Sequence, residues 1–574
     1  MGLEIVRQQS LQELGKRSRL WFHEDISNVL KTNTGSEKIE GIFLNLFHLQ
    51  ETIDFTTQAF AGMSKLRLLK VYQSDKISRN SEDTFKKENF KVRFSSNFKF
   101  CYDELRYLDL YGYSLKSLPN DFNAKNLVHL NMPCSHIKQL WKGIKVLEKL
   151  KCMDLSHSKY LLETPNLSRV INLERLVLED CVSLCKNFGN LEMLKELYAD
   201  GTALRELPSS LSSLRNLEIL SFEGCKGPPS ASWLLPRRSS NSTGFILHNL
   251  SGLCSLRKLD LSDCNLSDET NLSSLVYLSS LKDLYLCGNN FVTLPNLSRL
   301  SRLEHFRLEN CTRLQELPDL PSNIVLVDAR NCTSLKNVSV RNVQSFLLKN
   351  RVNRVLNVIW ALEMITPGSR LPDWIRYRSS DKEVIAELPP NWFNSNFLGF
   401  GFANVVPKFS SYRNFACSVY CCLFDSRSSD ITHGFKVIPY LSYARFYNPW
   451  LKLDHVELLY VPLSSFSDWH PWDHINWYQV THIKAFFRCL EFPEVMRYGI
   501  GLVYMIQFGS ISSASSPPNK STVVLTEIHD EEPSGSVDGS ELDNSGYYTA
   551  DEGNQLKLLA LRIRLNQRCS HRNA

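Results

Sequence analysis

The sequence predicts an α/β repeat solenoid with a parallel β-sheet on its concave face, followed by an antiparallel β-sandwich domain. Three observations support this fold class. A leucine phrase recurs at a near-constant interval between residues 105 and 329, and short alternating aromatic runs replace it after residue 366. Hydrophobic residues make up 43% of the 574 residues and charged residues 22%, which is typical of globular proteins.

The recurring phrase is L-x-x-L-x-L. It reads LRYLDL from Leu105, LERLVL from Leu173, LRKLDL from Leu256 and LKDLYL from Leu281. Looser copies start at Leu127, Leu150, Leu194, Leu217, Leu303 and Ile324, so that successive starts are 22, 23, 23, 21, 23, 39, 25, 22 and 21 residues apart. All intervals but one fall within the 20–29 residues of a leucine-rich repeat. The long interval is rich in Pro, Gly and Ser, which predicts a surface insertion at about residues 227–250.

Each phrase predicts a short strand whose side chains alternate between the core and the concave surface. In LRYLDL, Leu108 and Leu110 point inward, whereas Tyr107, Asp109 and Tyr111 point outward. Because the stacked repeats fix the outward positions, these form the candidate partner-binding surface. Its residues are Tyr107, Asp109, Tyr111, His129, Asp154, Arg175, Glu179, Tyr198, Asp200, Lys258, Asp260, Asp283, Tyr285, His305, Arg307, Asp328 and Arg330, with Asn131, Glu196, Glu223 and Glu309 at further outward positions.

The composition of this surface favours a protein partner. Tyr and Arg are enriched where proteins dock, whereas the many acidic residues would repel a polyanion. The formal net charge of +6 is small for this length and gives no case for nucleic acid. For any single residue the alternative is an ordinary solvated strand position, since a minority of interface residues carry the binding energy.

A second periodic feature lies three residues after the last leucine of each phrase. A leucine-rich repeat needs a small side chain there that reaches backbone groups of the adjacent turn. The residues at this ladder position are Cys181, Thr202, Cys225, Cys264, Asn289, Cys311 and Cys332. This register explains five of the 16 cysteines as buried structural residues, whereas metal or redox sites would favour C-x-x-C pairs, which do not occur. Leu-Pro pairs after the ladder position predict a convex side with few long helices.

The region from Thr366 to about Phe508 has a different pattern. Short alternating runs such as EVIAEL, FLGFGFANVV, HVELLYVPL and RYGIGLVYMIQF, bounded by Pro, Gly and Ser, predict an antiparallel β-sandwich. Trp374, Trp392 and Trp469 are candidates for its core.

Two clusters in this region could suggest chemistry. His470, Asp473 and His474 are metal-ligand types, but their spacing fits no strong zinc signature and Pro471 indicates a loop. The adjacent Cys421 and Cys422 would point to opposite faces of a strand, which disfavours joint chelation. We therefore expect no metal site.

The end of the sequence changes character twice. SSASSPPNKS and EIHDEEPSGSVDGSELDNSG have the composition of disordered segments. The last stretch, QLKLLALRIRLNQRCSHRNA, is apolar and basic. It could be a partner-binding helix, a membrane-surface segment or an incidental tail, and we favour the tail.

Several phrases resemble one protein family. The opening MGLEIVRQQSLQELGKRSRLWFHEDI, with GSEKIEGIFLNL and AFAGMSKLRLLKVY, resembles the junction between the nucleotide-binding module and the repeats of plant TIR-type nucleotide-binding leucine-rich-repeat immune receptors. PGSRLPDWIRYRSSDKEVIAELPPNWFNSNFLGF resembles their post-repeat C-terminal jelly-roll and Ig-like domain, the C-JID. Within this phrase, Arg370 replaces the usual acidic residue and Ile375 the usual aromatic one, which affects the expected contacts rather than the fold.

The resemblance implies a region that recognises a pathogen effector protein and holds the nucleotide-binding module of the same receptor inactive. Full-length relatives bind ADP, assemble into tetramers and cleave NAD⁺ through a TIR domain. The sequence contains no G-x-x-x-x-G-K-[ST] phosphate loop, and Gly15-Lys16-Arg17-Ser18 lacks the required glycine spacing. We therefore expect no catalytic residue, no cofactor and no enzymatic activity in this chain, and a tetramer only with the missing domains.

Two alternatives remain open. The chain could be a fragment of a full-length TIR receptor with NAD⁺ nucleosidase activity whose catalytic part lies elsewhere. It could also be a secreted leucine-rich-repeat receptor, since N-x-S/T triplets occur at Asn166, Asn241, Asn249, Asn265, Asn271, Asn296, Asn310 and Asn331. The N-terminus has no apolar signal region, the myristoylation pattern fails, and no stretch is long enough to span a bilayer. We expect a cytoplasmic or nuclear location and no membrane partner.

These observations predict five segments. They are a remnant of the nucleotide-binding module or linker at 1–40, the solenoid at 41–345 with its insertion loop, a linker at 346–365, a C-JID-like β-sandwich at 366–508, and a disordered acidic tail with a basic end at 509–574.

Overall fold

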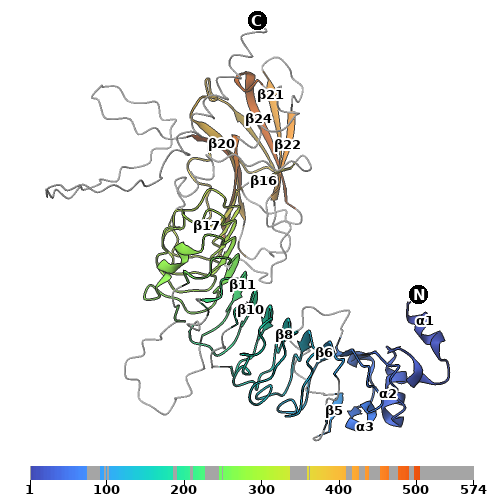
Figure 1. The fold of residues 1–574 in the computed structure, drawn as a ribbon. Coiled ribbons are helices and arrows are strands. Elements are labelled where there is room, and N and C mark those ends of the chain that lie inside the picture. Colours follow the sequence, from blue (N-terminus) through green and yellow to red (C-terminus); the bar gives the residue numbers. More distant parts are fainter. Residues whose placement is uncertain are drawn as a thin grey trace, which may run out of the picture.

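The computed structural model is an arc of stacked strands that ends in a two-sheet domain (Figure 1). It describes residues 2–73, 91–95, 98–99, 103–184, 191–206, 211, 213–226, 245–247, 250–336, 358–360, 362–406, 408, 417–425, 433–438, 453–463, 476–489 and 497–504. A curved parallel sheet followed by an antiparallel two-sheet region confirms the fold class expected from the sequence.

The α-helices lie at the N-terminal end of the arc (Figure 1). They are α1 (Gly2–Gln9), α2 (His23–Thr32) and α3 (Thr57–Phe60), with the 3-10 helices η1 (Leu14–Lys16) and η2 (Leu46–His48). Helix α2 carries Glu24 and Asp25 in its first turn, where carboxylates interact favourably with the helix dipole, and ends at Asn33 in a left-handed conformation. It buries Ile26, Val29 and Leu30 against the first repeats.

The concave face is a parallel sheet to which each repeat contributes one strand. Its strands are β1 (Arg19–Leu20), β2 (Gly41–Asn45), β4 (Leu68–Tyr72), β6 (Tyr107–Leu110), β7 (His129–Asn131), β8 (Cys152–Asp154), β9 (Arg175–Val177), β10 (Glu196–Tyr198), β11 (Ile219–Ser221), β12 (Lys258–Asp260), β13 (Asp283–Tyr285), β14 (His305–Arg307) and β15 (Leu326–Asp328). The apolar side chains of Leu108, Leu130 and Met153 pair in one buried row, because each phrase fixes the register of its strand. A separate two-stranded sheet joins β3 (Ile53–Phe55) to β5 (Val92–Phe94).

The sheet begins before the expected solenoid boundary. Strand β1 pairs in parallel with β2, so that Arg19 lies beside Gly41. Residues 1–40, expected as a remnant of another module, therefore supply α1, α2 and the first strand of the sheet. Their apolar side chains belong to the solenoid core, which explains why they fold with the repeats.

A left-handed residue follows each concave strand from β6 to β15, which explains the Gly, Asp and Asn residues that are common at this point. Its φ lies between 54° and 74° at Gly112, Cys134, His157, Asp180, Gly201, Gly224, Asp263, Gly288, Asn310 and Asn331. Gly, Asn and Asp adopt this conformation at the lowest cost. The backbone N–H then donates to a carbonyl oxygen of the next repeat, as from Asp180 to Asp200 and from Gly288 to Glu309, both at 2.7 Å.

The next residue is the ladder residue, which connects each repeat to the preceding one. The Cys264 thiol donates to the carbonyl oxygen of Phe222 at 3.0 Å, and the Asn289 amide donates to that of Leu261 at 2.9 Å. Cys181, Cys225, Cys311 and Cys332 donate to the preceding repeat in the same way, whereas Thr202 donates to Ala199 of its own repeat. The sequence analysis missed Ser158, whose hydroxyl donates back to Met132 at 3.3 Å.

The convex side is irregular in the repeats that the structure describes. It carries the 3-10 helix η5 (Leu272–Tyr277), and no α-helix follows α3 within these residues. This agrees with the expectation from the Leu-Pro pairs, since proline disfavours helix there.

The solenoid sheet continues without a break into the C-terminal domain. Strand β17 (Leu362–Pro367) pairs in parallel with β15 and antiparallel with β23 (His455–Pro462). The sheet then continues antiparallel through β20 (Phe397–Val406), β25 (Arg497–Tyr504) and β18 (Tyr377–Ser379), giving 18 strands in all. Residues 358–360 and 362–365, expected within a linker at 346–365, instead form β16 (Val358–Trp360) and most of β17, which satisfies the backbone edge of the last repeat.

A second sheet completes the sandwich. Its order is β16, β22 (His433–Ile438), β21 (Cys417–Asp425), β24 (Val480–Cys489) and β19 (Glu383–Glu387), with η10 (Trp477–Gln479) before β24. Phe400 and Phe402 of the first sheet pack with Val419 and Ile483 of the second in a core between the sheets. Cys421 is buried in this core and Cys422 is partly exposed, as expected for adjacent residues on a strand.

The phrase around Trp374 packs on a strip of glycines. A Cβ at Gly501 would lie 2.6 Å from Cε3 of Trp374, and one at Gly401 would also overlap this ring, so the glycines make room for the indole. Ile375 is fully buried over Gly499, where a side chain would collide with it. The substitution of Ile375 for the family's usual aromatic residue is therefore compatible with this fold.

The candidate core tryptophans have different environments. Trp392 is buried, and its Nε1 donates to the carbonyl oxygen of Val480 at 2.9 Å. Trp374 is partly buried and stacks on Tyr460 with 5.5 Å between ring centroids. Trp469 lies outside the described residues, as do His470, Asp473 and His474 and the segments beyond residue 504.

Candidate protein-interaction surface on the concave face

The register of the sheet places the predicted outward residues in three rows. The first row contains Tyr107, His129, Arg175, Lys258, Asp283 and His305, and the second contains Asp109, Asp154, Tyr198, Asp260, Tyr285, Arg307 and Asp328. The third row, two residues further along, contains Tyr111, Glu179, Asp200 and Arg330. Because neighbouring strands are parallel, side chains from different repeats meet along each row.

Not all of these side chains are accessible. Arg175 is exposed and most of the others are partly exposed, but Asp109, Asp260, Asp328 and Arg330 are buried. The alternating pattern of a strand predicts which way a side chain points, but it does not predict whether other parts of the chain bury that side chain. Asp260 accepts the backbone N–H of Ser262 at 3.1 Å, whereas Asp328 and Arg330 lie beside the strands of the C-terminal domain. These four residues are therefore unsuited to direct contact with a partner.

An acidic patch occupies the centre of the surface. We define it as Asp154, Glu179, Asp200, Glu223 and Asp260. Asp154 and Asp260 lie on β8 and β12, and the other three lie in the turns that follow β9, β10 and β11. Asp200 Oδ1 accepts the hydroxyl of Ser221 at 2.5 Å and the backbone N–H of Glu223 at 2.8 Å, which fixes its position.

Burial and mutual repulsion raise the pKa values of Glu179, Asp200 and Glu223, which makes these three carboxyl groups weaker acids. Burial is the main cause that raises the pKa of Asp200 to about 6. Burial, followed by repulsion from Asp260 and Asp200, raises the pKa of Glu223 to about 7. The pKa of Glu179 is raised by burial and then by Asp154. A cationic group brought to this patch would relieve the repulsion and favour the charged carboxylates.

Cation–aromatic contacts lie beside the acidic patch. Within its span, Arg175 lies over the ring of Tyr198 at 4.9 Å and donates to Glu196 at 2.7 Å. At its C-terminal end, the Tyr285 ring contacts Lys258 at 5.0 Å and Arg307 at 4.7 Å. These contacts hold Tyr and Arg side chains, the types that dominate protein interfaces, in fixed positions before a partner arrives.

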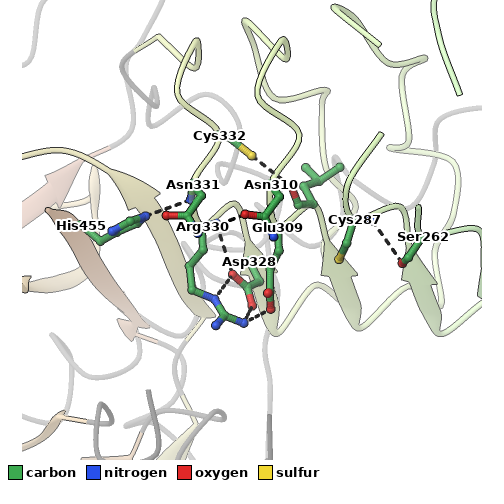
Figure 2. Close-up of polar contacts among 10 residues, drawn as sticks. Ser262, Cys287, Glu309, Asn310, Asp328, Arg330, Asn331, Cys332 and His455 are labelled. Atoms are coloured by element: carbon green, nitrogen blue, oxygen red, sulfur yellow. Dashed lines mark hydrogen bonds and ion pairs between the residues drawn. The ribbon is translucent and has the colours of Figure 1, made fainter. Parts of the chain in front are cut away.

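The C-terminal end of the surface is closed by an ion-pair cluster (Figure 2). Arg330 donates to Asp328 through Nε at 2.7 Å and through Nη2 at 2.5 Å, and it also pairs with Glu309. Burial raises the pKa of Asp328 to about 7, although the positive charge of Arg307 opposes this shift. This cluster joins the last two repeats next to the C-terminal domain, since Asp328 lies on β15, which pairs with β17.

The sequence analysis missed outward residues at both ends of the surface. Lys70 and Tyr72 lie on β4, where Lys70 Nζ is 3.9 Å from Asp109 and 5.0 Å from the Tyr72 ring centre. The phrase LRLLKV from Leu66 carries the required spacing and could have revealed them. At the other end, Glu363 of β17 continues the first row beside Leu326, although no leucine phrase precedes it.

The described residues offer little for other kinds of site. They contain no group of three or more His, Cys, Asp or Glu residues arranged to hold a metal ion. No helix among them is both long and apolar enough to cross a membrane.

The repeats, their ladder residues and the shared sheet define a leucine-rich-repeat protein with a C-terminal β-sandwich. Residues 126–145 match the Leucine Rich Repeat family model, and residues 366–508 match that of the C-JID domain. The resemblance to plant disease-resistance proteins expected from the sequence is confirmed, and the chain contains a leucine-rich repeat and a C-JID domain.

Three relatives from Arabidopsis thaliana illustrate the similarity. Disease resistance protein RPS4B is 28% identical over 492 residues, which cover 74% of this chain and 41% of that protein. Disease resistance protein RPS4 is 27% identical over 555 residues, covering 80% of this chain and 45% of the relative. Disease resistance protein RPP2A is 34% identical over 330 residues, which cover 57% of this chain and 21% of that protein. The chain thus spans less than half the length of these relatives.

Proposed function

We propose that this chain is the effector-recognition and autoinhibitory region of a plant intracellular immune receptor, acting in the cytoplasm or nucleus. Its concave surface binds a pathogen effector protein, together with the adjoining C-JID. The relatives are disease resistance proteins, which supports a role in defence. NAD⁺ cleavage, if the whole receptor performs it, belongs to a TIR domain that is not among the regions matched in this chain.

One observation carries the proposal: a single sheet brings an acidic patch and two sets of cation–aromatic contacts onto one face. The patch spans the repeats of β8 to β12, Arg175 and Tyr198 lie within this span on β9 and β10, and Tyr285 lies at its end on β13. Such a surface favours a protein that presents basic side chains at its centre and apolar or polar ones around them. Rigid aromatic and arginine side chains reduce the entropy lost on binding.

The test reverses charge only at accessible positions. We expect Glu179→Lys combined with Glu223→Lys and Arg175→Glu to reduce capture of a cognate effector by about tenfold or more, since several charge contacts become repulsive. Candidate effectors are co-expressed with the full chain in leaf tissue and recovered by pull-down. Capture at wild-type strength would exclude the concave surface as the binding site.

A matched variant controls for charge and folding. Glu37→Lys, Asp121→Lys and Glu269→Lys alter three exposed acidic residues away from the concave rows. We expect this variant to capture the effector normally and both variants to unfold at nearly the same temperature, since exposed substitutions shift stability by about 0.5 kcal/mol or less.

Autoinhibition requires a second partner, the nucleotide-binding module of the same receptor. We propose that the module docks on this region until the effector arrives. If so, the module expressed separately would co-purify with this chain, and an effector would release it. Failure to co-purify under any nucleotide condition would reject this part of the proposal. Assembly into a tetramer would need the module and the TIR domain in addition.

The secreted-receptor alternative makes a different prediction. Asn331 lies in an N-x-T triplet, but it is buried and its amide donates to Asn310 at 3.2 Å, so a glycan there would disrupt the turn. Asn166 is exposed and would accept a glycan without this cost. Intact-mass measurement of protein from leaf tissue distinguishes the two, because glycan at Asn166 would support secretion.

A further inference from the structure

Three carboxylates of the acidic patch, Glu179, Asp200 and Glu223, form no ion pair among the described residues. Arg175 and Lys258 act on Glu179 and Glu223 only without direct pairing, since Arg175 pairs with Glu196 at 2.7 Å and Lys258 lies over the Tyr285 ring. The patch therefore has more acidic groups than paired cations.

The same chain contains a segment of complementary charge. Residues 554–574, NQLKLLALRIRLNQRCSHRNA, carry one lysine and four arginines and no acidic residue. Its charge is therefore opposite in sign to that of the patch, which favours an electrostatic attraction between the two.

The intervening chain is long enough to connect the two. From Tyr504, at the end of β25, the path across the sheet to β11 runs through β20, β23, β17, β15, β14, β13 and β12. At about 4.8 Å between neighbouring strands, this path is about 40 Å long. A flexible chain of about 50 residues has a root-mean-square span of about 40 Å, and a fully extended one reaches about 170 Å. The length of residues 505–553 thus suits docking on the patch.

We propose that residues 554–574 dock on the acidic patch and compete there with the external protein partner. The inference rests on the proposed function for the meaning of this competition, but not for the docking itself. Arg side chains donate to the carboxylates of Glu179, Asp200 and Glu223, and the partner must displace them. Because the segment is tethered, its effective concentration at the patch is about millimolar, and even weak contacts keep it bound.

Zero-length cross-linking tests the docking in the full chain without any partner. A carbodiimide joins the amine of Lys557 to a neighbouring carboxylate as an amide, and Lys557 is the only lysine after Lys520. We expect mass spectrometry to find Lys557 joined to Glu179, Asp200 or Glu223. Reversal of three tail charges, Arg562→Glu, Arg564→Glu and Arg568→Glu, should lower the yield about tenfold, as should 1 M salt, where the screening length is about 3 Å.

The alternative occupant of the basic segment is the acidic stretch within residues 527–552 of the same chain. Cross-links from Lys557 to that stretch alone, or none at all, would overturn the proposal.

Limited proteolysis gives an independent readout. Docking should protect Arg562 and Arg564 from trypsin, and the triple variant Glu179→Gln, Asp200→Asn, Glu223→Gln should speed cleavage there about tenfold. The matched variant Glu37→Gln, Asp121→Asn, Glu269→Gln should leave the rate unchanged. Equal cleavage rates in all three proteins would contradict docking. Neither measurement uses an effector, so the two proposals can fail separately. If the charge-reversal variant loses effector capture but residues 554–574 are neither cross-linked to the patch nor protected from trypsin, the docking inference is rejected and the proposed function stands.

Discussion

His455 of the C-JID accepts the backbone N–H of Asn331 at 2.9 Å and thereby completes a series of such bonds that begins at Gly112 (Figure 2). In the earlier repeats the equivalent N–H donates to a carbonyl oxygen of the next repeat, as from Asn310 to Arg330 at 2.8 Å. Asn331 follows the last leucine phrase, and the imidazole takes the place of that carbonyl. Nδ1 lies 2.7 Å from the carbonyl oxygen of Leu453, so Nδ1 carries the proton and Nε2 accepts.

This arrangement predicts that acid weakens the junction. Burial, the main cause, lowers the pKa of His455 to about 4, against 6.5 for an unperturbed histidine. Between these values the unfolded chain binds more protons, so the stabilising effect is complete above pH 6.5 and is lost as the pH falls to 4. The difference corresponds to about 3 kcal/mol. Urea unfolding followed by tryptophan fluorescence at pH 7.5, 6 and 5 measures it.

His455→Gln provides the comparison, because Gln offers an acceptor and does not titrate. Other groups act in the opposite direction: the raised pKa of Asp328 makes its folded form bind protons more readily as the pH falls. The variant retains those groups. The difference between the free energies of unfolding of wild type and variant at each pH therefore gives the contribution of His455. We expect no such difference for His129→Gln on β7. A constant difference between wild type and His455→Gln at all three pH values would contradict the assigned role.

The ladder cysteines are expected to contribute to stability. Cys264 is fully buried and its thiol donates to Phe222 of the preceding repeat. Replacing it with Ala removes that contact and leaves a small cavity, which costs about 1–3 kcal/mol. Cys254 is exposed, and Cys254→Ala should change the free energy of unfolding by about 0.5 kcal/mol or less. Equal effects of the two substitutions in urea titrations would argue against the ladder.

Thiol reactivity should separate the same two classes of cysteine. Burial raises the pKa of Cys181 to about 12 and of Cys225 to about 11, so both remain protonated and inaccessible at pH 8. Iodoacetamide should therefore label Cys254 in the folded protein and reach Cys181 and Cys225 only after unfolding. Peptide mass spectrometry measures the labelling of each cysteine with and without 6 M urea. Rapid labelling of Cys181 without urea would contradict its burial.

The leucine phrase predicted much of this structure because its spacing acts locally. A strand of three residues between a buried leucine and a left-handed turn has one register, which placed Tyr198 and Tyr285 in the same outward row. The Cys and Asn ladder residues followed from the same spacing. Burial of Asp328 could not be predicted in this way, because its strand partner, Ile365 of β17, lies 37 residues further along the chain.

The shared sheet was hidden for a related reason. Strand β17 pairs with a repeat strand on one side and a sandwich strand on the other, yet it carries no leucine phrase. Every residue of β20 is buried because the second sheet packs on one face and the segment around Trp374 packs on the other, so its sequence shows no alternation of polar and apolar residues. His455 likewise gave no signal, since its role depends on a turn more than 120 residues earlier.

The glycine strip under Trp374 predicts a strong side-chain coupling. Gly501→Ala would bring a methyl group to 2.6 Å from the indole, and displacing the ring should cost about 1–3 kcal/mol. Trp374→Leu vacates the space, so adding Gly501→Ala to it should cost much less. Thermal unfolding of the four proteins in this double-mutant cycle gives the coupling energy. Additive effects of the two substitutions would mean that the ring does not rest on Gly501.

Removing Arg330 alone should destabilise the protein, whereas replacing both Arg330 and Asp328 with apolar residues should change its stability much less. Arg330→Leu leaves the buried Asp328 carboxylate without the group that donates to it at 2.7 and 2.5 Å, at a cost of about 3–5 kcal/mol. Replacing Asp328 with Leu as well removes the unpaired charge, and most of that loss should be recovered because a packed apolar pair avoids desolvation. Urea unfolding of the single and double variants tests both statements, with Arg175→Leu as the exposed control, expected to cost about 1 kcal/mol or less. A double variant less stable than Arg330→Leu would show that the ion pair stabilises the junction beyond compensating its own burial.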